Sequence, residues 1–155
     1  MKQRIINVYS FDELSDKAKE KALDEFRMMD NFTWQRDYND SLSAFLDQFG
    51  ASLMEYNIDM ASIDVSIDNS AFRGVKLKEF KPDYMPTGFC ADCELWETFY
   101  NEFKRTGDAK HAFFDALQNF MFTFRKDYEF SYSDEFLIDM IEANEYEFDA
   151  DGNLI

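Results

Sequence analysis

The hydrophobic positions of this chain recur mainly at intervals of three and four residues, the spacing of one face of an α-helix. The pattern predicts five helices, over residues 16–29, 33–49, 91–105, 109–126 and 133–144. Ser15 and Ser133 stand where a side chain can cap the first and last of them, and Gly50 and Gly107 stand where helices commonly end. The helix over 109–126 is apolar around most of its girth, which predicts a central position.

Two of these helices have a clear apolar stripe that we expect to face the core. The first stripe comprises Ala18, Ala22, Leu23, Phe26 and Met29, and the second comprises Trp34, Tyr38, Leu42, Phe45, Leu46 and Phe49. In the last helix, Phe136, Leu137, Met140 and Ile141 are expected to face inward while Glu135, Asp139 and Glu142 face solvent.

Other segments alternate or are rich in β-branched residues, and these predict strands. Residues 53–58 and 63–68 are the clearest, and residues 5–9 and 73–80 are further candidates. Asp151-Gly152 is a hairpin-turn signal near the C-terminus. Short links between strands favour an antiparallel arrangement. We therefore predict an α+β fold, with about five helices packed on a small antiparallel sheet, as a single globular domain over residues 1–155.

Composition adds that the chain is globular and strongly acidic. It is 46% hydrophobic and 18% aromatic, and its formal net charge is −16. Such a charge repels nucleic acids and anionic membranes and favours basic protein partners. No apolar run is long enough to span a bilayer and no secretory leader is visible, so with two cysteines we expect reduced thiols and a cytoplasmic location.

The acidic residues are concentrated in two segments, 28–72 and 127–155. The run DYEFSYSDEFLIDMIEANEYEFDAD, from Asp127 to Asp151, holds ten carboxylates and no Lys, Arg or His, yet it is dense in large apolar residues. A disordered acidic tail would lack such residues, so this segment is predicted to be folded. Its carboxylates would then be held on an ordered surface.

Regular spacing of these carboxylates suggests an imitation of nucleic acid. Alternate residues of a strand lie roughly 6.6 Å apart on one face, comparable to the gap between successive phosphates. Glu145, Glu147 and Asp149 have this spacing, and Asp64 and Asp68 offer a second, looser row. The predicted partner-binding residues are Asp134, Glu135, Asp139, Glu142, Glu145, Glu147, Asp149, Asp64 and Asp68.

Two segments carry a resemblance to known proteins. The opening YSFDELSDKAKEKALDEFR and the ending YSDEFLIDMIEANEYEFDADGNLI resemble the two ends of small proteins common in phage and prophage genomes. That group has no assigned activity, so the resemblance transfers no functional residue. It implies a phage or mobile-element origin and action inside a bacterial cell, and it agrees with an anti-CRISPR or antirestriction role.

Other chemistry has weaker signals. Cys90 and Cys93 form a single CxxC, and only His111, the one histidine, and nearby carboxylates would complete a metal site. No nucleophile motif accompanies His111, and no phosphate-binding glycine pattern occurs, so we predict no enzyme and no cofactor.

The leading hypothesis is a stoichiometric inhibitor of a bacterial nucleic-acid-targeting defence system. Its acidic surface would occupy the basic groove of a nucleic-acid-binding protein, without contacting nucleic acid or membrane itself. The alternatives are a small protein-interaction module acting through the loop at residues 82–93, and a metal-binding protein built on Cys90 and Cys93.

Overall fold

The computed structural model describes residues 5–155 and has an α+β fold, as predicted. It contains five α-helices and one two-stranded antiparallel sheet. The chain divides into two compact units, which are described separately below. The first combines both ends of the chain, residues up to Thr33 and Glu129–Ile155, and the second is Trp34–Tyr128. The single domain over 1–155 stays a prediction.

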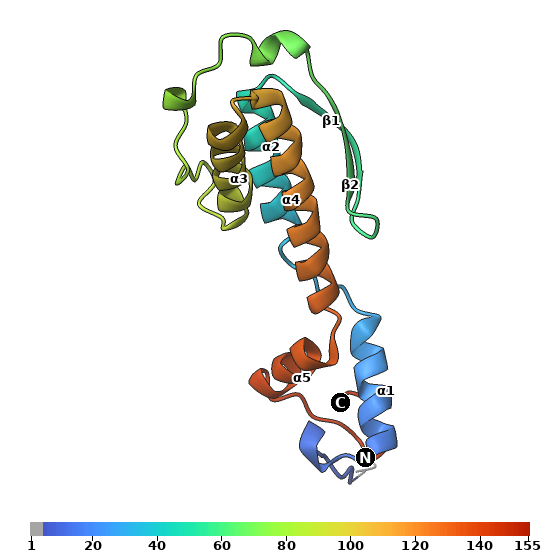
Figure 1. The fold of residues 1–155 in the computed structure, drawn as a ribbon. Coiled ribbons are helices and arrows are strands. Elements are labelled where there is room, and N and C mark those ends of the chain that lie inside the picture. Colours follow the sequence, from blue (N-terminus) through green and yellow to red (C-terminus); the bar gives the residue numbers. More distant parts are fainter. Residues whose placement is uncertain (1–4) are drawn as a thin grey trace. The chain divides into compact units, whose positions relative to one another are not determined.

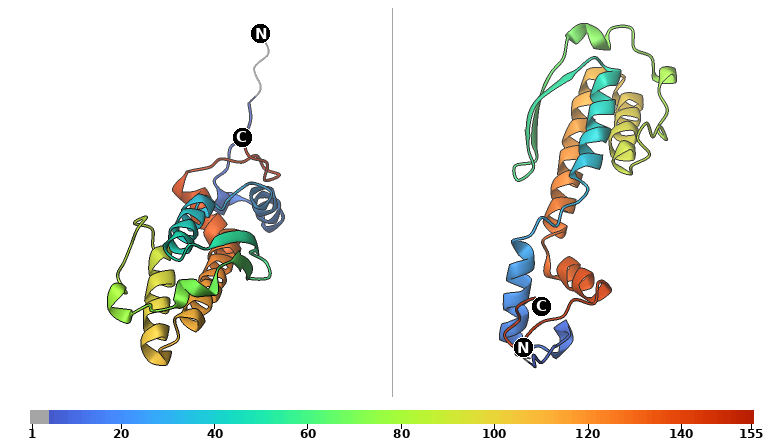
Figure 2. Two further views of the ribbon diagram at one scale, coloured as in Figure 1. Left: turned by 90° about the horizontal axis from the view of Figure 1, so that it is seen from above. Right: turned by 180° about the vertical axis from the view of Figure 1, so that it is seen from behind.

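The first unit is built from a short 3-10 turn and two helices, η1 (Phe11–Glu13), α1 (Asp16–Arg27) and α5 (Asp134–Ala143). Helices α1 and α5 lie side by side (Figures 1 and 2). Both begin with the predicted caps, since Ser15 Oγ accepts from Ala18 N and Ser133 Oγ accepts from Phe136 N, each at 3.3 Å. Their buried residues form one core: Phe11, Leu14, Ala18, Ala22, Leu23, Phe26, Leu137, Ile141 and Phe148.

The C-terminal segment of the first unit is held by single bridges rather than by full strands. Phe148 pairs with Tyr9 on one side and with Leu154 on the other. Two 2.9 Å hydrogen bonds join the backbones of Tyr9 and Phe148. The turn predicted at Asp151-Gly152 is present, with Gly152 at φ +83°. The strand predicted over residues 5–9 is wrong, because within that segment only Tyr9 makes a bridge.

The second unit contains three helices that lie side by side, α2 (Gln35–Gln48), α3 (Ala91–Thr106) and α4 (Ala109–Phe130) (Figure 1). Gly107, at φ +69°, ends α3 in the left-handed conformation and lets the chain turn into α4. The last two residues of α4 belong to the first unit. The predicted helix positions are confirmed, and α4 extends a turn beyond the expected end at residue 126.

The sheet of the second unit is a hairpin of β1 (Ser52–Asn57) and β2 (Ser62–Ser66), which runs beside the helices (Figure 2). The pairing aligns Leu53 with Val65 and Tyr56 with Ile63. The third strand predicted over residues 73–80 is wrong. Two 3-10 turns, η2 (Asn69–Phe72) and η3 (Leu77–Glu79), flank Gly74 at φ +68°, and this left-handed residue is incompatible with a continuous strand.

Aromatic side chains fill the centre of the second unit. Phe45 is fully buried, stacks on Phe113 with ring centroids 5.5 Å apart, and meets Trp96 edge-on at 4.9 Å. Phe49 meets the edge of Phe99 at 5.1 Å, so α2, α3 and α4 each contribute rings. The cluster provides the large buried apolar area that stabilises this unit.

Two residues assigned to the apolar stripes are not in the core. Met29 lies beyond the end of α1 and is 43% exposed, and Trp34 precedes α2 and is 38% exposed. Periodicity alone placed them on the inner faces, but α1 ends before Met29 and α2 begins after Trp34, so neither helix includes the residue. The other residues of the two stripes are buried.

Candidate acidic interaction surface

Helix α5 presents three carboxylates to solvent. Glu135, Asp139 and Glu142 are exposed, while Leu137 and Ile141 on the opposite face are buried. The spacing i, i+4, i+7 keeps the three acids on one side of the helix. The cap at Ser133 and the packing of Leu137 and Ile141 fix the direction of this face, as the sequence predicted.

Two further acids follow α5. Glu145 adopts the left-handed conformation at φ +53°, directly after the helix, and Glu147 precedes the buried Phe148. Both are exposed. The prediction that Glu145, Glu147 and Asp149 form a regular row along a strand is wrong, because Glu145 is not extended and Asp149 starts the turn. Their separation is therefore set by a turn and a single bridge rather than by the strand repeat.

A groove of about 550 Å³ lies between these acids and the N-terminal segment. Its apolar lining includes Val8, Phe11, Ile141 and Tyr146. Its acidic lining residues are Asp12, Glu13, Glu142, Glu145 and Glu147. The groove thus combines an apolar surface with five carboxylates.

Asp12 and Glu13 were missed as members of this surface. Glu13 Oε2 accepts from Ser10 N at 2.8 Å, and this hydrogen bond lowers the pKa of the Glu13 carboxyl below its usual range. Ser10 and Glu13 have the spacing of a capping box, which is a local sequence signal. The pairing of Tyr9 with Phe148 brings it beside the C-terminal acids, and no local pattern reveals such a pairing.

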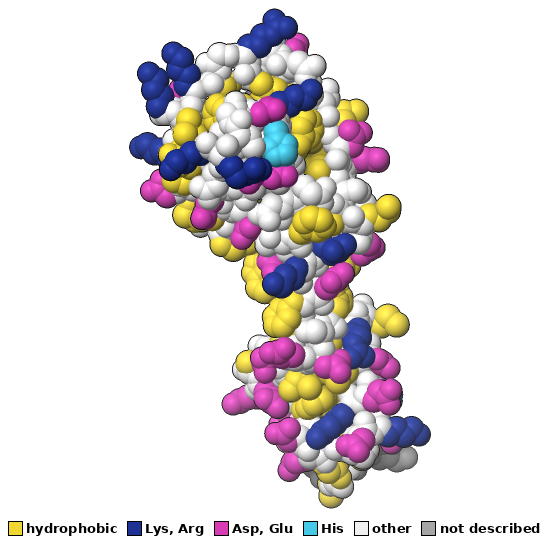
Figure 3. Space-filling model, in the orientation of Figure 1, with side chains coloured by type: hydrophobic (Ala, Val, Ile, Leu, Met, Phe, Trp, Pro, Cys, Tyr) yellow, Lys and Arg dark blue, Asp and Glu magenta, His cyan; other side chains and the backbone are white. Residues whose placement is uncertain are grey.

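The basic residues of the first unit, as far as the structure describes it, all lie on α1. They are Lys17, Lys19, Lys21 and Arg27. Arg27 pairs with Asp24 and Asp134, and Lys21 donates to Asn153. Residues 129–155 contain nine carboxylates and no Lys, Arg or His. Figure 3 shows Asp and Glu side chains crowding the visible surface of this unit.

Two predicted partner-binding residues have structural roles in the first unit. Asp134 forms the ion pair with Arg27, which ties the start of α5 to the end of α1. Asp149 accepts hydrogen bonds from the backbone of Asp151 and Asn153, both at 2.9 Å, and from Asn153 Nδ2 at 2.7 Å. These carboxylates are exposed or half-buried but already engaged, so they contribute less to a partner than the others.

The turn at Asp149 should make the first unit sensitive to acid. The hydrogen bonds from Asn153, then that from Asp151, lower the pKa of the Asp149 carboxyl below its usual value. Because this pKa is lower in the folded protein than in the unfolded chain, ionised Asp149 stabilises the fold at pH values above its unfolded-state pKa of about 4. The stabilisation is lost as the pH falls through the pKa of the folded state. We expect Asp149→Asn to lower the urea midpoint of the first unit at neutral pH, with the difference from wild type vanishing in strong acid.

The control for this prediction is Asp151→Asn. Asp151 contributes its backbone N–H to the turn by donating to Asp149 Oδ1, so replacing the Asp151 carboxylate leaves this hydrogen bond intact. Far-ultraviolet circular dichroism at several pH values follows both variants. A difference between Asp149→Asn and wild type that stays constant from neutral to acidic pH would contradict the role assigned to this carboxylate.

Asp64 and Asp68 belong to the second unit. Asp64 is exposed on β2, where Ile63 and Val65 are half-buried, so the predicted alternation is confirmed. Asp68 lies beyond β2 and caps η2, because its Oδ1 accepts from Ser70 N at 2.8 Å. That backbone hydrogen bond lowers the pKa of the Asp68 carboxyl.

Cys90, Cys93 and His111 are not brought together as one metal site. Among the residues described, His111 instead lies near Glu102 and Asp115, and the ligand atoms of these three side chains are all within 4.8 Å of one another. Burial, followed by the charge of Asp127, raises the pKa of the Cys90 thiol. A raised pKa keeps the thiol protonated and disfavours both nucleophilic and metal-binding chemistry.

The loop at residues 82–93 is anchored at its C-terminal end. Asp92 is buried, and its Oδ2 accepts from Thr87 N, Thr87 Oγ1 and Gly88 N at 2.9–3.1 Å. Tyr84 meets the edge of Trp96 at 5.1 Å. This loop is therefore tied to the start of α3 at several points.

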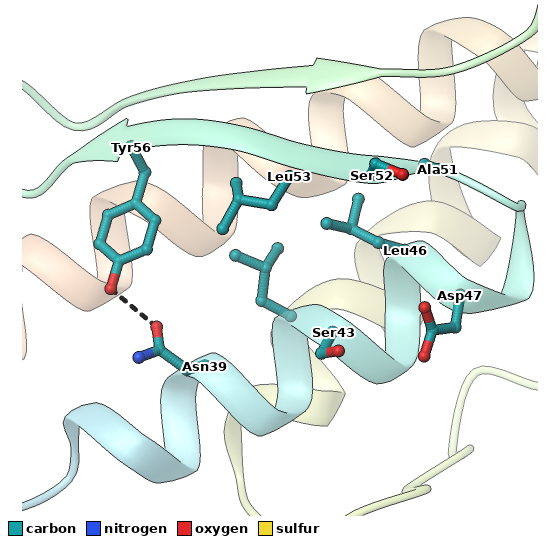
Figure 4. Close-up of a pocket in the computed structure, with 9 residues that line it drawn as sticks. Asn39, Ser43, Leu46, Asp47, Ala51, Ser52, Leu53 and Tyr56 are labelled. Atoms are coloured by element: carbon teal, nitrogen blue, oxygen red, sulfur yellow. Dashed lines mark hydrogen bonds between the residues drawn. The ribbon is translucent and has the colours of Figure 1, made fainter.

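A second depression, of about 290 Å³, lies between α2 and β1 (Figure 4). Leu42, Leu46 and Leu53 give it an apolar character, and Tyr56 donates a 2.7 Å hydrogen bond to Asn39 at one end. Asp47 is its single charged residue. The lining holds no second carboxylate, histidine or cysteine that could pair with Asp47.

Comparisons of the chain with models of known families, with curated proteins and with solved structures gave no match. None of the helices in the described part of the chain is long and apolar enough to cross a membrane.

Proposed function

We propose that the protein is an inhibitor that presents the acidic surface of its first unit to the basic groove of a nucleic-acid-binding protein. The interacting residues are Glu135, Asp139, Glu142, Glu145 and Glu147, with Asp12 and Glu13 on the same groove. The observation that carries the proposal is the separation of charge within this unit, whose described basic residues are confined to α1 while residues 129–155 carry none.

The physical argument is electrostatic. The five carboxylates are exposed and take no part in the ion pairs of the described residues, so each is available to a Lys or Arg of a partner. Surfaces of opposite charge associate faster, and like-charged surfaces repel each other, so the charge also determines which partner binds. A rigid acidic surface also loses little conformational entropy on binding, and α5 is capped and packed.

The resemblance of both chain ends to phage proteins supports a bacterial defence system as the source of the partner. Both segments that carry it, residues 9–27 and 132–155, lie in the first unit. A CRISPR effector or a restriction enzyme holds nucleic acid in a groove lined by Lys and Arg. Occupation of that groove would block the enzyme in proportion to the inhibitor added.

Charge reversal of the surface tests the proposal. Replacement of Glu135, Asp139, Glu142, Glu145 and Glu147 by Lys should abolish capture of the partner from bacterial lysate, because attraction becomes repulsion. Capture is measured by affinity purification and quantitative mass spectrometry, and circular dichroism checks the fold.

The matched control reverses five exposed acids of the second unit, Asp37, Asp47, Asp59, Asp83 and Glu97. It changes the net charge by the same amount but leaves the first unit intact, so capture of a Lys- and Arg-rich partner should weaken only modestly. Equal loss in both variants would show that total charge, rather than the surface on α5, determines binding.

A further inference from the structure

We propose that Glu102, His111 and Asp115 form a binding site for a divalent transition-metal ion, with zinc the best fit. The three residues offer one imidazole nitrogen and two carboxylate oxygens that all lie within 4.8 Å of one another. The site lies on α3 and α4 of the second unit and is independent of the acidic surface.

Local structure brings the three ligands together. His111 and Asp115 are four residues apart on α4 and so share one face of that helix. Glu102 lies near the end of α3, and the left-handed Gly107 folds α3 back onto α4. His111 Nε2 and Glu102 Oε2 are 3.6 Å apart. The start of α4 is fixed in turn, because Asp108 Oδ1 accepts from His111 N at 3.0 Å.

The donor set and its dimensions suit zinc. Zinc binds His nitrogen and carboxylate oxygen at about 2.0–2.2 Å in tetrahedral geometry, so two of its ligand atoms lie roughly 3.4 Å apart. The His111–Glu102 separation is already close to this value. Asp115 is exposed, and rotation of its side chain can bring its oxygen to the ion. Water would complete the coordination, as at zinc sites with three protein ligands.

Arg105 competes with the ion for Glu102. Its Nη2 lies 2.5 Å and its Nε 3.2 Å from Glu102 Oε2. A metal ion must displace or share this contact, so removal of the guanidinium should strengthen metal binding.

Titration of the full-length protein with cobalt(II), a coloured substitute for zinc, tests the site. We expect one equivalent to bind with visible ligand-field bands, without the intense thiolate-to-cobalt band that Cys90 and Cys93 would give, and excess zinc to abolish these bands. Both His111→Gln and Asp115→Asn should weaken binding at least about tenfold, a loss in the range seen when zinc sites are perturbed. Arg105→Gln should tighten it.

A Cys90→Ser/Cys93→Ser variant is the control and should bind as wild type does. His111 and Asp115 are exposed, so these substitutions leave the fold intact, which circular dichroism verifies. No saturable binding, binding unaffected by His111→Gln, or binding lost in the double cysteine variant would each overturn the proposal.

Discussion

Replacement of Phe45 by Ala should destabilise the second unit by about 3–5 kcal/mol, the usual cost of emptying a buried aromatic site. Phe45 is fully buried and its ring contacts Phe49, Trp96, Phe99 and Phe113, from all three helices of this unit. The substitution removes this shared contact and leaves a cavity that the helices cannot fill without moving. Both tryptophans of the chain lie in the second unit, so their fluorescence during urea unfolding reports on it directly.

Phe122→Ala is the matched control, because Phe122 lies on α4 and is 50% exposed. Its ring contacts the Arg125 guanidinium at 5.6 Å, and its loss should cost less than about 1 kcal/mol. Similar destabilisation by both substitutions would contradict the assignment of the core to the rings around Phe45.

Replacement of Gly152 by Ala should destabilise the first unit by about 2–5 kcal/mol, combining left-handed strain with overpacking. A Cβ at Gly152 would stand 2.2 Å from the carbonyl oxygen of Ala18 and 2.9 Å from its carbonyl carbon. Both contacts are with backbone of α1, which cannot rotate away as a side chain can. We expect faster hydrogen exchange in α1 and α5, measured by mass spectrometry, and a lower midpoint in urea.

Gly107→Ala separates the two causes. Gly107 has a similar φ of +69°, but nothing lies within 4 Å of its added Cβ. It should therefore cost only the left-handed strain, about 1–2 kcal/mol. If Gly152→Ala is no more harmful than Gly107→Ala, the close approach of the C-terminal turn to α1 is wrong.

Local patterns predicted the helices well because each carries its own signals. Ser15, Ser133 and Gly107 mark helix ends through hydrogen bonds or backbone conformation that depend on a few neighbours. The segments 5–9 and 73–80 failed because a strand requires a partner. In the first segment only Tyr9 pairs with another segment, through a single bridge to Phe148. In the second segment Gly74 interrupts the extended backbone.

The candidate surface was predictable only in part for the same reason. The outward acids of α5 follow from helical spacing, whereas the contribution of Asp12 and Glu13 depends on pairing between distant ends of the chain. His111 lay four residues from Asp115 in the sequence, but its approach to Glu102 depends on how α3 folds back onto α4. Helical stripes show which faces are apolar, not which stripes meet.

The most direct test of the proposed function is competition between the protein and nucleic acid for the captured partner. A fluorescently labelled duplex is bound to the purified partner, and the protein is added in increasing amounts while anisotropy is recorded. The proposed function predicts full release of the duplex at one equivalent, with no release by the variant reversed at Glu135, Asp139, Glu142, Glu145 and Glu147. A stable complex of partner, duplex and protein together would contradict it.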